Sequence, residues 1–455
     1  SLNAEPYVTR IAETNNKQLF VVINRVGLFH FDPVTGQVNR PEDPILRRQG
    51  SIIALANHSK KNTIWVASEG DNFFHIFSPL GGANLKHLST VQLQDPADNH
   101  NITAFHEDAR GGMWIGTANG IFAHDLNGNT QLISNKVRFI NDIKHDPRGR
   151  IWIGTEKDGV FILDRAAKSW TLQKIKLHID KYESLSVQSI LCQQNGLVYI
   201  ATKEGGVYLY DPDKNYAEEI SNTYGISEEG LLDVLEDNQG TIWFTTLKRI
   251  IRYNPKSHAS NYYSTADGIA VSTFFKNSIL KRSTGELFFG GNNGLCSIDP
   301  AQQAINTGRS KVKVKISDIL IQNRSLFDIR KGEHFDPEKN RIELKHTEST
   351  MGIEFSSPDY YTARKIQYAY RMSGIDKDWN YVGNNRRFVN YANLMPGTYL
   401  FEVRSSDENG VWSDEVTSLR IHIKPPLYQT WWAYLLYILV TISLTYLIVH
   451  NIANR

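Results

Sequence analysis

The stretch MWIGTANGIFAHD, residues 113–125, decides the fold, because variants of it recur along the first two thirds of the chain. It combines an aromatic-led strand, a short loop that ends in glycine, and a second strand that ends in aspartate. The next copy, RIWIGTEKDGVFILD at residues 150–164, repeats each of these features. Seven copies can be aligned, and their leading aromatic residues are Phe20, Trp65, Trp114, Trp152, Tyr199, Trp243 and Phe288.

The spacing of these aromatic residues is nearly constant, at 45, 49, 38, 47, 44 and 45 residues. A period of about 45 residues with several short strands per unit is typical of the blade of a β-propeller. The sequence therefore predicts an all-β chain that begins with a seven-bladed β-propeller over residues 1–307.

Each position in the repeat has a physical role. A large aromatic residue is expected to pack between neighbouring blades, and a small residue two positions later, on the same face of the strand, leaves room for the next blade. Glycine at the end of the loop suits the positive φ of a tight hairpin, as predicted for Gly27, Gly120, Gly159, Gly206 and Gly294. A short acid after the second strand is expected to bind the backbone of the next turn, as predicted for Asp32, Asp125, Asp164, Asp211 and Asp299.

An apolar run precedes each aromatic strand and is expected to form the innermost strand of its blade. The pairs Glu107–Asp108 and Glu236–Asp237 close two of these runs and resemble the paired carboxylates of a glycoside hydrolase. The aspartate recurs at the same turn position across blades, however, and Asp146 is a further example. This recurrence indicates turn chemistry rather than catalysis.

The repeat stops near residue 307, and a different pattern begins. Alternating strands at short intervals continue as far as Pro426, which is typical of a β-sandwich. The sequence LMPGTY at residues 394–399 resembles the tyrosine corner of immunoglobulin-like folds, and Asn409–Gly410 predicts a hairpin turn. We therefore expect a sandwich domain over residues 308–426.

An uncharged apolar segment follows the sandwich, from Leu427 to Val449. About 20 apolar residues are enough to span a bilayer, and Trp431 and Trp432 suit the interfacial aromatic belt at the start of such a segment. We expect a transmembrane helix over residues 427–450 and the start of a cytoplasmic segment over residues 451–455. The alternative is a helix buried in a soluble protein.

The composition excludes several classes of protein. Lysine and arginine number 50 against 48 aspartates and glutamates, so no basic surplus indicates a nucleic-acid partner. The two cysteines, Cys192 and Cys296, exclude a disulfide framework and a thiolate zinc site. No nucleophile, phosphate-loop or zinc-protease motif occurs, and the stretch Asp211–Asn215 departs from a calcium loop because Tyr216 stands where glycine is required. We expect no catalytic residues, no metal and no cofactor.

The order of these parts resembles the sensory region of hybrid two-component systems from glycan-degrading anaerobic bacteria. The resemblance rests on the repeats, on the stretches DYYTARKIQYAYRMSGIDKDWNYVG at 359–383 and NYANLMPGTYLFEVRSSDENGVWS at 390–413, and on the apolar segment after them. Such regions join two-component regulator propeller repeats to a triple-tyrosine domain, whose stretch holds Tyr360, Tyr361, Tyr368, Tyr370, Tyr391 and Tyr399 here. Because those sensors usually carry two propellers, the resemblance implies a further propeller before Ser1.

The resemblance also implies a function. It implies a periplasmic receptor region that one helix holds in the bacterial inner membrane, with the C-terminus in the cytoplasm. This region would bind an oligosaccharide and signal through a homodimer to a cytoplasmic histidine kinase, which would lie after Arg455. The ligand would shift the population between two arrangements of the dimer.

The predicted ligand site lies at one mouth of the propeller. The loops that enter the innermost strands and the loops that join the next two strands are expected on the same face, and ligand sites favour such concave places. Arginine and lysine there suit an acidic sugar, and tyrosine suits stacking on a sugar ring. The predicted ligand-binding residues are Arg25, Asn119, Arg138, Lys157, Tyr182, Lys203, Tyr224, Lys248, Arg249 and Asn293.

Two other functions remain open from the sequence. A membrane-anchored propeller could serve as a scaffold for protein–protein interaction. An enzyme would need paired carboxylates on the innermost strands near the propeller axis, whereas those strands are mostly apolar.

Overall fold

The computed structural model describes residues 7–48, 51–94, 101–166, 169–175, 177, 185–204, 206–224, 226, 229–303, 313–326, 340–357, 366–383, 386–406, 412–426, 428 and 431–454. The chain divides into two compact units, residues 1–306 and 307–455. Strands dominate both units. Of the predicted features, Tyr182, Tyr360, Tyr361 and the Asn409–Gly410 turn lie outside the described residues.

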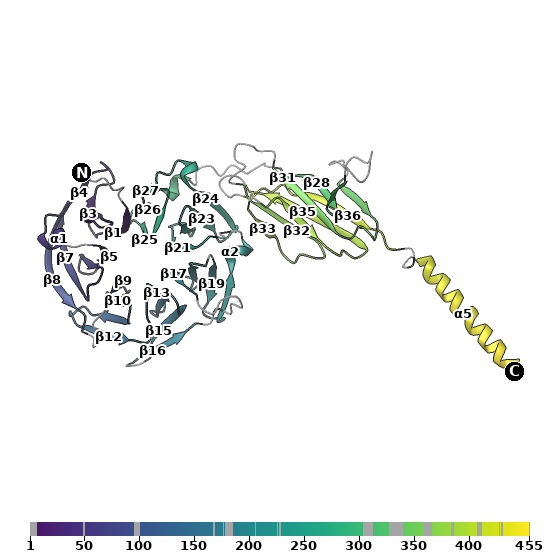
Figure 1. Ribbon diagram of the computed structural model, residues 1–455, viewed down its shortest axis with the longest axis horizontal. Coiled ribbons are helices and arrows are strands. Elements are labelled where there is room, and N and C mark those ends of the chain that lie inside the picture. The colour runs from purple at the N-terminus through teal and green to yellow at the C-terminus, as the bar shows by residue number, and fades with distance from the viewer. Residues whose placement is uncertain are drawn as a thin grey trace. The chain divides into compact units, whose positions relative to one another are not determined.

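The first unit contains seven sheets arranged around a ring in its described part (Figure 1). Each sheet is made by one contiguous segment whose strands follow one another in sequence order. The first three sheets contain β1 (Val8–Glu13), β2 (Leu19–Ile23), β3 (Gly27–Phe31) and β4 (Val38–Asn39), then β5 (Ile52–His58), β6 (Thr63–Ser68), β7 (Phe73–Gly81) and β8 (Asn84–Gln92), then β9 (Ile102–Glu107), β10 (Met113–Thr117), β11 (Ile121–His124) and β12 (Thr130–Ser134).

The other four sheets continue the same order around the ring. They contain β13 (Ile140–His145), β14 (Ile151–Thr155), β15 (Val160–Ala166) and β16 (Ser169–Lys174), then β17 (Val187–Cys192), β18 (Val198–Thr202), β19 (Val207–Asp211) and β20 (Tyr216–Glu219), then β21 (Leu231–Glu236), β22 (Ile242–Thr246), β23 (Ile250–Asn254) and β24 (Ala259–Tyr263), and finally β25 (Phe274–Lys281), β26 (Leu287–Gly291) and β27 (Gly294–Ile298). Short helical turns connect some sheets at α1 (Pro44–Arg48), α2 (Ile220–Thr223), η1 (Thr265–Asp267) and α3 (Pro300–Gln303). The seven sheets coincide with the seven sequence repeats.

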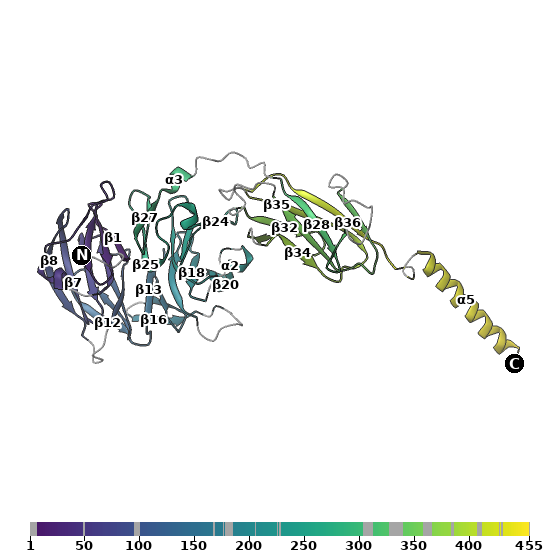
Figure 2. The same ribbon diagram turned by 45° about the horizontal axis from the view of Figure 1, so that its top comes forward.

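The first strand of each sheet lies on the inside of the ring. The strands β1, β5, β9, β13, β17, β21 and β25 each contact the next one, and β25 contacts β1 again. Figure 2 shows the same sheets side by side after a turn of 45°. No strand is shared between the first and the last sheet, so side chains close the ring.

In the third and fourth sheets the small residue two positions after the leading aromatic makes room for the next sheet, as predicted. A Cβ built on Gly116 would lie 2.6 Å from Cγ2 of Ile140, and one built on Gly154 would lie 2.6 Å from Cγ1 of Val187. Both neighbours belong to the first strand of the following sheet. Trp152 is fully buried against β17, the strand that contains Val187. The aromatic residue and the glycine therefore together set the distance between these two sheets.

The recurring aspartate after the first strand forms a turn, as predicted, and it also binds the leading tryptophan. Oδ1 of Asp146 accepts the backbone N–H groups two and four residues later, both at 3.0 Å, while Oδ2 accepts Nε1–H of Trp152 at 3.0 Å. Asp108 and Asp237 make the equivalent three bonds. The turn and the buried aromatic residue are therefore held by one carboxylate.

The neighbouring glutamates bind the preceding sheet. The carboxylate of Glu107 accepts the backbone N–H groups of Ser59 at 2.6 Å and Lys60 at 3.1 Å. Oε1 of Glu236 accepts the amide of Gln193 at 2.8 Å. In each acidic pair the glutamate therefore joins two neighbouring blades, and the aspartate holds the turn of its own blade.

Two parts of the turn prediction are wrong at individual positions. Gly27, Gly159 and Gly294 have positive φ as predicted, but Gly120 and Gly206 do not. Those two positions need glycine for space, because a Cβ on Gly120 would lie 2.7 Å from a carbonyl oxygen of β12, and a Cβ on Gly206 would lie 2.7 Å from the ring of the tyrosine two residues later.

The prediction for the turn aspartates is likewise right at most positions and wrong at one. Asp32, Asp125, Asp211 and Asp299 each accept the backbone N–H two residues later, as predicted. Asp164 instead lies within β15, because this strand continues to Ala166 and pairs with β16 across Asp164.

The second unit begins with two packed sheets. One has the order β29–β28–β31–β34 and the other has the order β30–β36–β35–β32–β33. The oxygen of Tyr399 donates its hydrogen bond to the carbonyl oxygen of Met395 at 3.0 Å, which confirms the predicted tyrosine corner. The strands are β28 (Lys315–Ile321), β29 (Arg324–Ser325), β30 (Arg341–Leu344), β31 (Met351–Ser356), β32 (Tyr368–Met372), β33 (Asn380–Val382), β34 (Phe388–Tyr391), β35 (Gly397–Ser405) and β36 (Thr417–Ile423).

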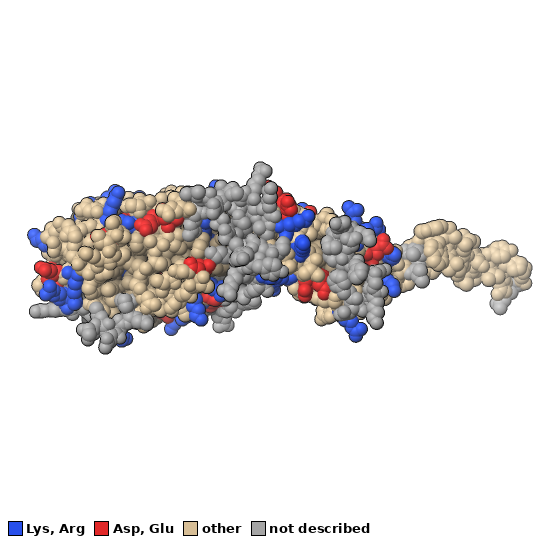
Figure 3. Space-filling view, turned by 90° about the horizontal axis from the view of Figure 1, so that it is seen from above, with Lys and Arg blue, Asp and Glu red and all other residues tan. Residues whose placement is uncertain are grey.

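One long helix, α5 (Trp431–Ala453), ends the described chain. Its 23 residues reach a mean hydropathy of 2.0, so by length and composition it can cross a membrane. Figure 3 shows it free of charged side chains. Every described side chain of the helix except Ala433 is exposed, in contrast to the alternative of a helix buried in a soluble core. The described helix ends three residues beyond the predicted span 427–450, of which residues 427, 429 and 430 lie outside the described residues.

Candidate functional site

The two predicted sets of loops do lie on one face of the ring, and hydrogen bonds join them. The backbone N–H of Glu156, at the tip of the β14–β15 hairpin, donates to the carbonyl oxygen of Phe139, which lies before β13, at 2.9 Å. Lys203 donates to Ser186 at 2.9 Å in the next sheet. We call these hairpin tips and strand-entry loops together the loop face.

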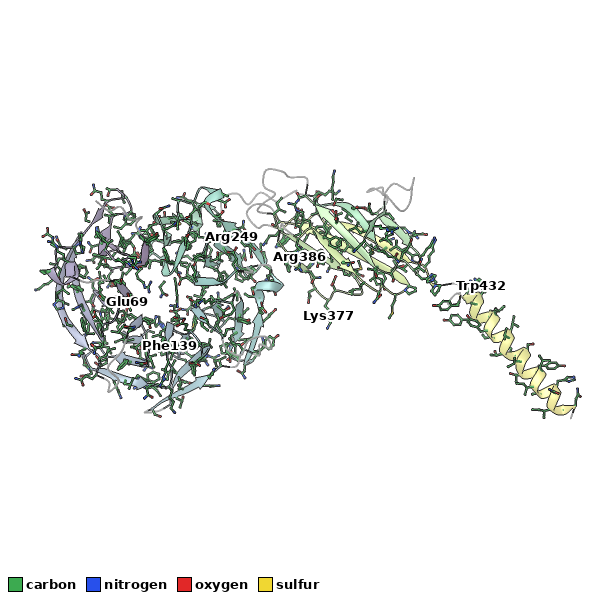
Figure 4. All side chains as sticks on the ribbon, viewed as in Figure 1. Glu69, Phe139, Arg249, Lys377, Arg386 and Trp432 are labelled. Atoms are coloured by element: carbon green, nitrogen blue, oxygen red, sulfur yellow. The ribbon has the colours of Figure 1, made fainter. Side chains whose placement is uncertain are left out.

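Most of the predicted ligand residues project from the loop face into solvent. Figure 4 places Glu69, Phe139 and Arg249 on different sheets around the ring. Asn119 is only half-exposed, and its backbone N–H donates to Oγ1 of Thr117 at 3.2 Å. The exposed predicted residues are Arg25, Arg138, Lys157, Lys203, Lys248, Arg249 and Asn293.

Tyr224 has a different environment from the other predicted residues. Its ring stacks on the imidazole of His258 with centroids 4.0 Å apart and an angle of 5°. It is half-buried and packs against the apolar core of the sixth sheet, close to Tyr253. Because of this packing, the ring of Tyr224 has a structural role, and little of its surface is available to a ligand.

Phe139 is a residue of the loop face that the sequence analysis missed. It is 44% exposed and has a φ of 50°, which is rare for a bulky side chain and costs backbone energy. The ammonium of Lys157 lies 5.5 Å from its ring centroid, and Arg138 precedes it. In the sequence Phe139 belongs to the apolar run before Trp152, which is expected to form an innermost strand, but β13 begins only at Ile140.

Acidic side chains share the loop face with the basic ones. Glu229 pairs with Arg249 at 3.7 Å, and the carboxylate of Glu204 accepts the backbone N–H of Ser186 at 3.2 Å. Arg138 and Lys203 form no ion pair with any residue that the structure describes. The loop face therefore combines cations that are free to bind a ligand with an exposed aromatic ring.

Family models match a part of each unit. Residues 96–119 and 132–157 match the two component regulator propeller repeat, and residues 359–424 match the Y_Y_Y domain. The chain is 27% identical over 321 residues to histidine kinase P4 of Formosa agariphila, an alignment that covers 68% of this chain and 22% of that protein. The chain thus spans about a fifth of the length of this relative.

Solved structures share the fold. The extracellular domain of a one component system from B. thetaiotaomicron matches with a TM-score of 0.50 and 20% identity, over 94% of this chain and 57% of that chain. A catalytically inactive virginiamycin B lyase from Staphylococcus aureus matches with a TM-score of 0.52 and 12% identity, over 65% of this chain and 96% of that chain. At these identities the structures show a common fold and nothing about ligands.

The family matches, the fold and the histidine kinase relative agree with one another. Residues 96–119 and 132–157 therefore match the two component regulator propeller repeat, residues 359–424 after them match the Y_Y_Y domain, and the chain is similar in sequence to a part of a histidine kinase.

Proposed function

We propose that this chain is the periplasmic ligand-sensing region of a membrane-bound receptor that detects an oligosaccharide. Its histidine kinase relative is about five times as long as the matched part, so the rest of a similar receptor has room for a cytoplasmic kinase. The helix α5 supplies a membrane anchor, with residues 1–426 on the periplasmic side of a bacterial inner membrane and the C-terminus in the cytoplasm.

The observation that carries this proposal is the group formed by Phe139, Arg138 and Lys157 on the loop face. An exposed aromatic ring offers a flat apolar surface for a sugar ring, and the neighbouring cations offer charge-assisted hydrogen bonds to a carboxylate or sulfate. A non-glycine residue with positive φ is held there by the surrounding fold, as is common where a side chain is presented for function. We infer that the ligand is an acidic oligosaccharide.

Signal transfer requires two arrangements of the receptor whose populations the ligand changes. A chain with one membrane helix can transmit such a change through a partner copy, so we propose a homodimer in which the sandwich domains relay the signal. Sedimentation of the full chain in detergent, with and without oligosaccharide, tests this step. A monomer at every concentration and with every ligand would contradict the relay.

A thermal-shift panel of neutral and acidic oligosaccharides tests the ligand. We expect one acidic class to raise the unfolding temperature of the full chain in detergent. Phe139→Ala should abolish the shift, whereas Tyr216→Ala, which removes an exposed ring from the outer strand β20, should preserve it. No shift with any sugar, while protein partners still bind the loop face, would favour the scaffold function instead.

A further inference from the structure

A group of charged side chains lines the inside of the ring. The first strands of the sheets carry a bulge close to their beginning, and Arg10, Asp142 and Asp233 each follow such a bulge. Lys276 lies within the wider irregularity of β25 between Phe274 and Ile279. We call Arg10, Asp142, Asp233 and Lys276 the axial cluster.

Arg10 uses part of its guanidinium to join three sheets. Nε donates to the carbonyl oxygen of Ile53 at 2.8 Å, and Nη1 donates to those of Thr9 at 2.6 Å and Lys276 at 3.1 Å. Nη2 makes no hydrogen bond with a residue that the structure describes. Burial lowers the pKa of Arg10 to about 10 and Asp233 opposes this effect, so the side chain is charged at neutral pH.

Structural partners occupy both carboxylates of the axial cluster. Asp233 accepts the backbone N–H of Asn277 at 2.9 Å and that of the following residue at 3.3 Å. Asp142 accepts the backbone N–H of Ile190 at 2.8 Å and pairs with the ammonium of Lys144 at 2.6 Å. These bonds link each first strand to the next one, and they leave the carboxylates little capacity for further donors.

Lys276 is the unsatisfied member of the axial cluster. Its ammonium has no hydrogen bond or ion pair with any residue in the described part of the chain. Burial lowers its pKa to about 8, while Asp233, Asp142 and Glu156 act in the opposite direction. Lys276 belongs to β25, the first strand of the seventh sheet, and therefore lies on the inside of the ring beside Arg10 of β1.

We propose that the axial cluster binds a small oxyanion, held between the ammonium of Lys276 and Nη2 of Arg10. Both groups are hydrogen-bond donors, and the acceptors around them are already occupied. Within the axial cluster Lys144 neutralises Asp142, so Arg10 and Lys276 outnumber the remaining carboxylate, Asp233, while Glu156 acts on Lys276 less than either aspartate does.

The chemistry of the cluster selects the class of ligand. Arg10 and Lys276 are half-buried cations with free donors on the inside of the ring, and an oxyanion supplies both acceptors for these donors and negative charge. A metal cation would face Arg10 and Lys276 and would find few free oxygen ligands. Phosphate, sulfate and the carboxylate of an acidic sugar all fit the same pair of donors, and the inference therefore does not depend on the proposed oligosaccharide.

Isothermal titration calorimetry on the full chain in non-ionic detergent at pH 7 tests the proposal. Sodium sulfate, sodium phosphate and sodium galacturonate are the probes, and sodium chloride at equal ionic strength is the blank. We expect one site, with binding roughly tenfold or more weaker in Lys276→Met. Lys276→Gln serves as a second variant, and Lys281→Met removes an exposed lysine from the same strand as the matched control.

Each outcome has a defined meaning. Binding of sulfate or phosphate that Lys276→Met weakens and Lys281→Met preserves supports a site for a free inorganic anion. Binding of galacturonate alone, with the same dependence on Lys276, supports a sugar carboxylate as the source. If none of the three probes gives heat above the chloride blank, or if both Lys276 variants bind as the unchanged chain does, the axial oxyanion site does not exist.

Discussion

The carboxylate of Glu13, in the first sheet of the ring, accepts the Nε–H of Arg282, in the last sheet, at 3.0 Å. Both side chains are about nine-tenths buried, and Glu13 also accepts the backbone N–H of Ser283 at 2.6 Å. Glu107 and Glu236 make the corresponding contact between consecutive sheets. The closure of the ring therefore repeats the glutamate-to-turn contact that joins the second sheet to the third and the fifth sheet to the sixth.

Arg282→Leu should weaken this closure, because it leaves a largely buried Glu13 without its cation. We expect the free energy of unfolding to fall by about 3 kcal/mol in urea titrations of the full chain. Arg341→Leu breaks an exposed ion pair with Glu343 and should cost below about 1 kcal/mol. Equal losses in the two variants would contradict the special role of the closure.

Asp146→Ala should destabilise the fourth sheet by about 3 kcal/mol, because four donors, including Nε1–H of Trp152 and Nε–H of Arg150, lose a charged acceptor. Asp164→Ala is the matched control, since this exposed strand residue has no such turn, and we expect a change within about 0.5 kcal/mol. Thermal unfolding of both variants provides the measurement. A similar shift for both would disprove the role of the turn carboxylate.

Gly154→Ala should destabilise the propeller by about 2 kcal/mol, because the new methyl group overlaps Val187 of the next sheet. Val187→Ala creates space at the same place. We expect the double variant to be more stable than the sum of the single changes predicts, by about 1 kcal/mol or more. Strict additivity in a double-mutant cycle would show that the two sheets do not meet through this pair.

Asp233 should make stability depend on pH. Burial raises its folded pKa to about 6 from an ordinary value of 3.8, so its contribution is fully present below pH 3.8 and is lost as the pH rises through 6. The size of this loss is on the order of 3 kcal/mol. Urea midpoints of the unchanged chain and Asp233→Asn, measured between pH 4 and 7, should differ by an amount that falls with rising pH. A constant difference would contradict the raised pKa.

The sequence predicted the propeller because its signal is local and repeated. Trp114 and Trp152 are each followed by the same sequence, Ile-Gly-Thr. Because this pattern repeats, it shows which residues share a face of the strand before any contact is known. Individual turns were harder to predict. Gly120 and Gly159 occupy the same position in the repeat, yet one needs space beside β12 and the other needs positive φ.

The candidate sites were predictable only in part. The positions of Arg138 and Lys157 follow from the repeat, whereas Phe139 was hidden in an apolar run whose first residue precedes the strand. The axial cluster could not be predicted. Arg10 and Lys276 are 266 residues apart and meet only because the last sheet lies beside the first.

The way in which the ring closes has a consequence during synthesis. The partner of Glu13 in the closure is 269 residues further along the chain, so the inner flank of the first sheet has no native neighbour until the seventh repeat has been translated. At the usual rate of about 5–20 residues per second, this interval is roughly 13 to 54 seconds. The nascent chain must protect Val8, Ile11 and Val21 during that interval, since Phe288 of the last repeat covers them in the finished protein.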